Sequence, residues 1–227
     1  MKIHDCKQNT TEWLDLRAGI PTASQFDRII TPTGKPSASA IPYMHQLLAE
    51  RLMGRPIIGY VSIDIDRGKN LEADAVSFYE FTRDVTTVAV GFVTNDEETI
   101  GASPDRFVGD DGLLETKVPK EHTHVGYLLG NPVDRAYFPQ LMGQLWITGR
   151  AYAEILSYHP SMPPALVRVE RDEKYIALLA NAVTAFSMEL ESQWEKLRAE
   201  YVKPEPPKED PWLTDEDVAF AIARVEG

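Results

Sequence analysis

The sequence contains a single cysteine, Cys6, and no apolar run near the ~20 residues that a membrane-spanning helix needs. One thiol excludes a disulfide framework within the chain and any metal or iron–sulfur cluster held by several of its cysteines. The N-terminal stretch MKIHDCKQNTTEW also lacks the apolar core of a secretory signal. We therefore expect a cytoplasmic protein.

Positive charge is also scarce, because 23 Lys and Arg residues face 35 Asp and Glu residues and the formal net charge is −12. This balance argues against a protein that coats long DNA without specificity. It does not exclude an enzyme that binds DNA in one channel, since many of the acidic residues lie near the C-terminus, in residues 189–200 and 205–217. With 43% hydrophobic and 26% charged residues, the chain is neither disordered nor membrane-embedded.

The spacing of apolar residues predicts both helices and strands. Apolar side chains recur at helical spacing in four segments, 44–52, 69–82, 135–152 and 173–200. A further helix should carry Phe26, Ile29 and Ile30, with Thr22 or Ser24 as its cap. The sequence predicts strands over residues 85–93, 100–103, 113–118 and 165–169. The turn 109–112 should join the second strand to the third.

The order of these elements favours an α/β fold with a central mixed β-sheet flanked by helices. We expect the folded domain to span residues 1–202. The proline-rich stretch 203–208 is typical of a stiff linker. Residues 203–227 should therefore form a linker and a short C-terminal helix.

The pattern that indicates chemistry is Asp105, nine intervening residues, and then Glu115-Thr116-Lys117. Successive side chains of a strand alternate between its faces, so Glu115 and Lys117 should project to the same side. A neighbouring strand that ends at Asp105 would bring a second carboxylate against Glu115. Two carboxylates make an oxygen-rich site suited to Mg²⁺, and the lysine could orient or deprotonate water or balance charge on a phosphate.

A solvated strand face is the alternative explanation for Glu-x-Lys. The flanking Leu113, Leu114 and Val118 favour a buried strand, on which a glutamate and a lysine need compensating partners. The functional interpretation is therefore the stronger one.

These residues and several others resemble a known nuclease family. Pro104-Asp105 with Glu115-Thr116-Lys117 looks like the PD-(D/E)xK nuclease motif, which implies a restriction-endonuclease-like core. Residues 12–24 are similar to the Trp-x3-Arg-x-Gly-x-x-Thr-Ala-Ser signature of the phage lambda exonuclease (YqaJ-like) family. Further similarity to that family lies in residues 68–72, 138–141, 146–149 and 169–175. The resemblance thus spans residues 12–175 in one order.

The resemblance implies a magnesium-dependent exonuclease that degrades one strand of linear double-stranded DNA 5′→3′ to mononucleotides. Family members are ring-shaped homotrimers that leave a 3′ single strand for a single-strand annealing protein during recombination. A bacterial host cell, with a phage or prophage gene, is then the expected setting. Two alternatives stay open: an endonuclease of the restriction or junction-resolving type, and a catalytically silent DNA-end-binding subunit.

The resemblance also implies roles for residues at the metal site. Asp105, Glu115 and the Thr116 carbonyl would hold Mg²⁺, or Mn²⁺, with two ions expected per active site. Lys117 would activate or position the attacking water. Glu72 and Gln140 would complete the water and metal network.

A second group of residues would bind DNA. Arg17 and Ser24 would hold the 5′-terminal phosphate, with Ser103 as a weaker candidate and Lys35 as a candidate backbone contact. An arginine offers a planar fork of donors, and a hydroxyl near a helix N-terminus adds a partner for phosphate. Without the resemblance, a surface arginine and a simple helix cap would be the better interpretation of Arg17 and Ser24.

Three features remain ambiguous in the sequence. The family often has an acidic residue about ten positions before the motif aspartate, where this chain has Asn95 followed by Asp96. His122 and His124 are expected to lie in a mobile loop rather than to bind metal. The alternation of apolar and acidic residues around Ile63 and Ile65 could indicate an edge strand or a wedge that splits the duplex.

Overall fold

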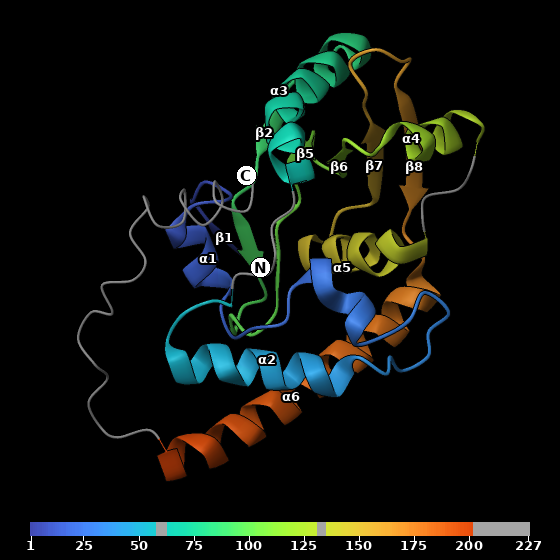
Figure 1. Cartoon of the computed structure of the whole chain (residues 1–227). Helices are drawn as coiled ribbons and strands as arrows, with labels where there is room; N and C mark the ends of the chain where they lie inside the picture. Colours follow the sequence, from blue (N-terminus) through green and yellow to red (C-terminus); the bar gives the residue numbers. More distant parts are fainter. Residues whose placement is uncertain (58–62, 131–134, 202–227) are drawn as a thin grey trace.

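The computed structural model describes residues 1–57, 63–130 and 135–201 (Figure 1). The expected linker and C-terminal helix, residues 203–227, lie outside the described residues. The first elements are β1 (Lys2–His4), α1 (Thr11–Arg17), the 3₁₀ helix η1 (Ala23–Arg28), α2 (Ala40–Met53), α3 (Ile63–Arg83), β2 (Thr87–Ala89), β3 (Phe92–Thr94) and β4 (Gly101–Ala102). The later elements are β5 (Arg106–Val108), β6 (Gly112–Lys117), α4 (Glu121–Leu128), the 3₁₀ helix η2 (Arg135–Tyr137), α5 (Phe138–Thr148), β7 (Tyr152–Ser157), β8 (Ala165–Glu170) and α6 (Glu173–Tyr201).

A five-stranded mixed sheet, in the order β2-β5-β6-β7-β8, forms the centre of the fold. β6 and β7 are parallel, and the other neighbours pair antiparallel. A smaller antiparallel sheet has the order β1-β3-β4. The expected central mixed sheet flanked by helices is confirmed. Among the described helices, none is both long and apolar enough to cross a membrane.

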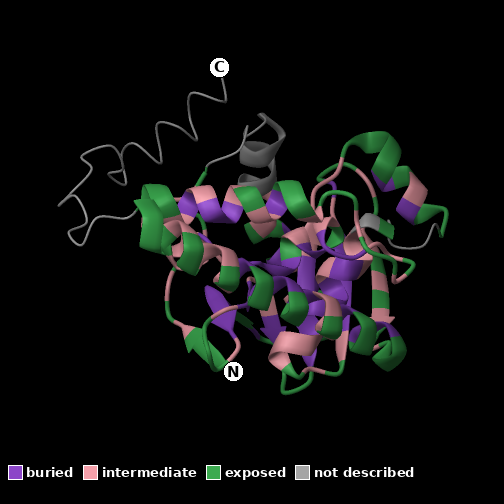
Figure 2. Ribbon diagram, turned by 90° about the horizontal axis from the view of Figure 1, so that it is seen from below, coloured by how far each residue is buried: buried purple, intermediate pink, exposed green. Residues whose placement is uncertain are grey.

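The alternation of side chains along β6 assigns helices to the two faces of the large sheet. Leu113 belongs to the main core, with residues of η1, α2, α5 and α6. Leu114 points to the other face, where it packs with Ala75, Val76 and Tyr79 of α3. Buried residues accordingly gather in the interior, while exposed residues line the outer surfaces of the helices (Figure 2). Glu115 has the same strand parity as Leu113 and lies on the α5 side.

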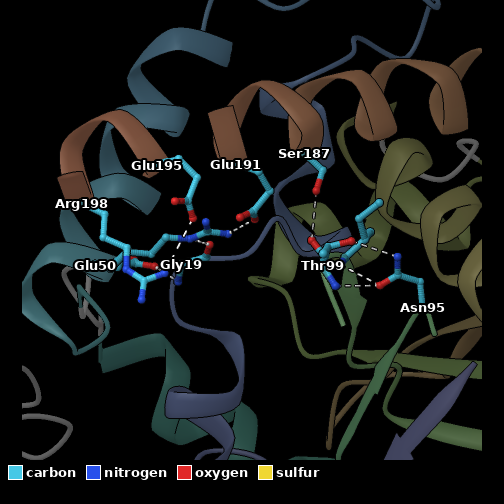
Figure 3. Close-up of polar contacts among 10 residues, drawn as sticks. Gly19, Glu50, Asn95, Thr99, Ser187, Glu191, Glu195 and Arg198 are labelled. Carbon is cyan, nitrogen blue, oxygen red and sulfur yellow. Dashed lines mark hydrogen bonds and ion pairs between the residues drawn. The ribbon is translucent and has the colours of Figure 1, made fainter. Parts of the chain in front are cut away.

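The loop after α1 is fastened to α2 and α6. The Gly19 N–H donates to the buried Glu50 carboxylate at 2.8 Å, and its carbonyl accepts from Arg51 Nε at 2.7 Å. Arg51 also pairs with Glu191 of α6 at 2.6 Å (Figure 3). Gly19 has φ +72°, and a Cβ there would lie 2.5 Å from Arg51 Cγ, so glycine is required. These contacts fix the end of α1, which carries Arg17.

Several expected elements are confirmed, with small changes at their ends. Apolar residues of segments 44–52, 69–82 and 173–200 lie in α2, α3 and α6, and the strands over 113–118 and 165–169 correspond to β6 and β8. The sequence did not reveal the short strands β1 and β5 or the six-residue strand β7.

The expected single strand over residues 85–93 is wrong, because two separate strands, β2 and β3, form there. The chain forms β2, leaves the large sheet, and enters the small sheet as β3. The reason is pairing: β2 hydrogen-bonds to β5, whereas β3 hydrogen-bonds to β1 and β4. The turn 109–112 likewise joins β5 to β6 and not β4 to β6. Asp105 therefore lies just before β5 instead of ending the earlier strand.

Two expected helices also need correction. The helix over residues 135–152 ends at Thr148, because Gly149 takes a left-handed C-cap conformation with φ 69° and Tyr152 begins β7. The segment with Phe26 is a 3₁₀ helix, and its N-cap residue Thr22 makes no side-chain capping bond. The hydroxyls of Thr22 and Ser24 contact the Arg17 guanidinium instead.

The remaining corrections concern the histidine segment and the isoleucines. His122 and His124 lie in α4, not in a loop; His124 is buried, with its ring nitrogens 2.8 Å from Ser157 Oγ and 2.9 Å from the Pro163 carbonyl. The backbone at Ile63 and Ile65 is helical, which excludes the edge strand. Residues 58–62 lie outside the described residues.

Candidate active site

Two carboxylates meet where β5 and β6 pair. The antiparallel register places Arg106 opposite Leu114, so Asp105, one residue earlier, falls opposite Glu115. Residues directly opposite each other in an antiparallel pair have Cβ atoms about 4.5–5.5 Å apart. The expected convergence of the two carboxylates is thus a consequence of strand register.

The Asp105 carboxyl lies in surroundings that disfavour its charge. Its Oδ2 accepts hydrogen bonds from the Thr116 N–H and hydroxyl, both at 2.7 Å. Burial, and after it the negative charge of Glu115, raises the pKa of Asp105 to about 8. The Thr116 hydrogen bonds and the Lys117 charge oppose this shift only in part. A carboxyl held in this way favours a bound proton or cation.

Glu115 is held by donors on both of its oxygens. Oε1 accepts from Lys117 Nζ at 2.8 Å and from Gln140 Nε2 at 2.7 Å, and Oε2 accepts from Gln144 Nε2 at 3.0 Å. Gln140 and Gln144 are four residues apart on α5, so one face of that helix presents both amides. Glu115 is 4% exposed, and these three bonds supply the partners that a buried carboxylate needs.

Gln144 is a site residue that the sequence reasoning missed. It is 1% exposed, and its Oε1 is buried without a hydrogen-bond partner among the described residues. A carboxylate accepts hydrogen bonds, so the amide must turn its NH₂ toward Glu115 and leave Oε1 for another donor, such as a water molecule. The available signal was its four-residue spacing from Gln140.

Lys117 is a charged partner of the carboxylates in this structure. Burial lowers the pKa of its ammonium, but the charge of Glu115 and the hydrogen bond to it outweigh burial, and the net shift is upward. The ring of Tyr137 lies 4.7 Å from Nζ and adds a cation–π contact. Lys117 is therefore protonated here and acts as a donor.

Glu72 and Asp105 line one cavity of about 840 Å³, together with residues of the N-terminal segment. Glu72 comes from α3, which covers the opposite face of the sheet from α5. The structure thus places Glu72 beside the space in front of Asp105. Within the described residues, however, no three His, Cys, Asp or Glu side chains group closely enough to hold a metal ion.

A second polar cluster surrounds Arg17 at the end of α1. The guanidinium donates to Ser103 Oγ at 3.0 Å, to Ser24 Oγ at 3.1 Å and to Thr22 Oγ1 at 3.4 Å. The structure therefore brings together the three residues expected to hold a phosphate. Burial lowers the pKa of Arg17 to about 10, so the guanidinium stays cationic at neutral pH.

Trp13 is a further residue of this cluster that sequence reasoning did not assign. Its Nε1 donates to Ser103 Oγ at 2.9 Å, and the Arg17 guanidinium carbon lies 4.1 Å from the centre of its ring. The signal was its position one helical turn before Arg17. Trp13 therefore contacts both Ser103 and the Arg17 guanidinium and helps to fix their positions.

The remaining candidates lie apart from these clusters. Lys35 is an exposed loop residue whose N–H donates to Thr31 Oγ1 at 3.1 Å. Asn95 Oδ1 accepts the Thr99 and Ile100 N–H groups in the turn between β3 and β4 (Figure 3). Asp96 is exposed and pairs with the N-terminal amino group. In the described part, neither Asn95 nor Asp96 completes a metal-binding group with the carboxylate pair.

The donor set at Asp105 and Glu115 fits one hard divalent cation. Both side chains offer carboxylate oxygens, which Mg²⁺ and Mn²⁺ prefer. The raised pKa of Asp105 indicates a local shortage of positive charge that a cation would relieve. The backbone carbonyl of Thr116, which follows Glu115 directly, is a candidate for a further ligand.

Comparison with known proteins identifies the family of this chain. The family model of the YqaJ-like viral recombinase domain matches residues 12–151. The chain belongs to the YqaJ-like viral recombinase family. An alkaline exonuclease, LHK-Exo from Laribacter hongkongensis, is 32% identical to this YqaJ-like chain with a TM-score of 0.75, and the match covers 84% of this chain and 97% of that one.

Two other solved structures are similar to the YqaJ-like chain. LHK-Exo in complex with dAMP matches with a TM-score of 0.76 at the same 32% identity, over 84% of this chain and 97% of that chain. A phage-related exonuclease from Haemophilus somnus 129PT, 16% identical with a TM-score of 0.64, shares the fold over 78% of this chain and 96% of its own. A search of curated proteins gives no match. The alkaline exonuclease relatives support a nuclease role.

Asp105→Asn should stabilise the metal-free YqaJ-like protein more at about pH 9 than at about pH 5. The folded-state pKa of about 8 lies above the ordinary 3.8. The stability that protonated Asp105 contributes is therefore complete below about pH 4 and is lost as the pH rises through about 8. Melting temperatures in EDTA across this range measure the effect. Asp110→Asn, in the exposed turn before β6, is the control, and equal gains at both pH values would contradict the prediction.

Proposed function

We propose that the protein is a Mg²⁺-dependent 5′→3′ exonuclease that degrades one strand of linear double-stranded DNA to mononucleotides. One observation carries this proposal: Ser103, of the arginine cluster, lies two residues before Asp105, of the carboxylate pair. A single short segment thereby joins a candidate anchor for a terminal phosphate to a candidate cleavage site. The product would be a duplex with a 3′ single-stranded overhang.

Asp105, Glu115 and the Thr116 carbonyl would hold the cation. When bound, Mg²⁺ supplies charge stabilisation at the scissile phosphate and lowers the pKa of a coordinated water. The two described carboxylates suffice for one ion, and we propose that a second ion takes its other ligands from DNA and water. Mn²⁺ would satisfy the same oxygen ligands.

Lys117, Gln140 and Glu72 would act around the ion and the substrate. Oε1 of Glu115 faces Lys117 and Gln140, while Oε2 is engaged by Gln144, which is almost fully buried. The more accessible Lys117 and Gln140 are therefore placed to turn toward a water or a phosphate oxygen. Lys117 would position or activate the water, and Glu72 would accept hydrogen bonds from it.

Arg17, Ser24 and Ser103 would hold the 5′-terminal phosphate. A guanidinium with hydroxyl neighbours offers several donors to one phosphate group. Anchoring the 5′ end would present the first phosphodiester to the carboxylate pair and so favour one direction of travel. The LHK-Exo relative binds dAMP, a deoxymononucleotide, which supports a mononucleotide product. Lys35 is proposed only as a peripheral contact to the DNA backbone.

End-labelled linear duplex, incubated with Mg²⁺ or with EDTA, tests the proposal. We expect mononucleotides from the 5′ ends in Mg²⁺ and no product in EDTA. Lys117→Ala should lower kcat by at least about 10²–10³-fold, because a donor to the developing phosphate charge is lost, while DNA affinity changes little. Rapid nicking of a covalently closed plasmid would indicate an endonuclease instead, and binding without any product would indicate a silent end-binding subunit.

Arg17→Ala should remove the preference for 5′-phosphorylated over 5′-hydroxyl ends. The loss of the guanidinium leaves only neutral donors at the anchor, so a terminal phosphate gains little. Initial rates on the two duplexes measure the ratio, with Arg28→Ala, on the neighbouring η1, as a control. A ratio equal to that of the wild type would contradict the anchor.

We also propose a homotrimeric ring that encloses DNA and passes the 3′ strand to a single-strand annealing protein. The family resemblance supports this arrangement, and a ring would explain how an acidic chain stays on its substrate. Light scattering should give three times the chain mass of 25.5 kDa. A monomer at micromolar concentration would contradict the ring.

A further inference from the structure

Helix α5 packs against the short helix η1 and also contacts β4 and β7 (Figure 1). One side of the helix sends Gln140 and Gln144 to Glu115. Next to them, Gly143 faces η1, the short helix that carries Ser24. The position of Ser24 relative to the carboxylate pair therefore depends on how closely η1 approaches α5.

The approach is limited by an aromatic ring packed directly on Gly143. A Cβ at this position would lie 2.4 Å from Cδ2 and 2.6 Å from Cε2 of Phe26, and 3.3 Å from the Cβ of Ala23. Phe26 is 0% exposed and Ala23 is 1% exposed. Neither can swing into solvent, so a methyl group on Gly143 would push η1 away from α5.

A glycine inside α5 also needs an explanation, because glycine destabilises a helix interior relative to alanine. Ser24 lies between Ala23 and Phe26 in the sequence, so it moves with the two residues that contact Gly143. Its hydroxyl accepts from Arg17, whose other nitrogen donates to Ser103. The position of Ser24, one of the hydrogen-bond partners of Arg17, is thus tied to the Gly143 contact.

We propose that Gly143 is a positioning residue that sets the spacing between the 5′-phosphate anchor and the Asp105–Glu115 pair. The contact of Phe26 with the bare α-carbon holds η1 at the one distance that aligns the first phosphodiester of an anchored strand with the carboxylates. This inference rests on the proposed function, since it needs an anchored 5′ end. Strands without a 5′ phosphate are not anchored, so their cleavage does not depend on the spacing.

The test compares single-turnover release of the first nucleotide from duplexes with 5′-phosphate and 5′-hydroxyl ends in Mg²⁺. Gly143→Ala should lower the rate on 5′-phosphate ends by up to about 10²-fold, because a displacement of about 1 Å misaligns the reacting group. The rate on 5′-hydroxyl ends should stay within about twofold, so the ratio of the two rates falls. Adding Phe26→Leu to Gly143→Ala removes the clashing ring atoms and should restore most of the ratio.

Controls separate positioning from stability. In Gly112→Ala, at the start of β6, the new Cβ would lie 2.5 Å from Cζ of Tyr152. This contact does not involve η1 or α5, so the ratio should not change even if both rates fall. If Gly143→Ala does not fold, Phe26→Leu alone carries the test, because the space it opens frees η1 and should lower the ratio. Melting temperatures report folding for every variant.

The outcomes distinguish this inference from the proposed function. A wild type with no preference for 5′-phosphate ends would overturn both. A wild-type preference that survives in Gly143→Ala, or that falls equally in Gly112→Ala, would overturn the spacing role and leave the exonuclease proposal standing. A selective loss on 5′-phosphate ends with rescue by Phe26→Leu would support the spacing role.

Discussion

Two acidic side chains facing each other across a strand pair are the constraint on which the rest of the structure depends. Asp105 and Glu115 oppose each other because β5 and β6 are antiparallel and in the register that puts Arg106 against Leu114. Burial strengthens their repulsion, since fewer water dipoles screen it. Hydrogen-bond donors offset this repulsion. Thr116 donates to Asp105, and one lysine and two glutamines donate to Glu115. These donors satisfy one carboxylate more fully than the other, and Asp105 keeps a raised pKa. A cation would complete the balance.

Helices α5 and α3 approach the site from opposite faces of the large sheet. Helix α5 lies on the Glu115 face and supplies the amides of Gln140 and Gln144, one helical turn apart. Helix α3 covers the opposite face, and its Glu72 lines the same cavity as Asp105. The parallel neighbour β7 extends the register past Lys117, whose carbonyl accepts the Tyr158 N–H at 2.9 Å. This bond holds the end of β6 in place. The lysine backbone is therefore fixed, and its Nζ lies between Glu115 and the Tyr137 ring.

Sequence patterns predicted the chemistry of the site better than the paths of the short strands. Glu115 and Lys117 lie on a six-residue strand whose apolar neighbours mark it as buried, so their common direction followed from alternation alone. β4 and β5 have two and three residues, too few to show a period, and their partners are chosen by tertiary packing. The sequence therefore predicted the turn 109–112 correctly but assigned it to β4 and β6, whereas it joins β5 to β6. Gln144 escaped notice for a related reason: α5 buries residues all around this part of its circumference, and a polar residue there gives no amphipathic signal.

The charges of the chain explain why a local anchor matters. With a net charge of −12, the protein cannot hold DNA by a general positive field. Several described arginines are already paired with carboxylates, among them Arg51 with Glu191, Arg83 with Glu154 and Arg171 with Glu173. Arg17 differs, because its hydrogen bonds go to hydroxyls. A hydroxyl can rotate to donate to a phosphate that a carboxylate would repel. Arg17 lies beside the segment that carries Asp105, through its bond to Ser103. In our proposal, the approach of η1 to α5 therefore sets which phosphodiester bond reaches the carboxylates.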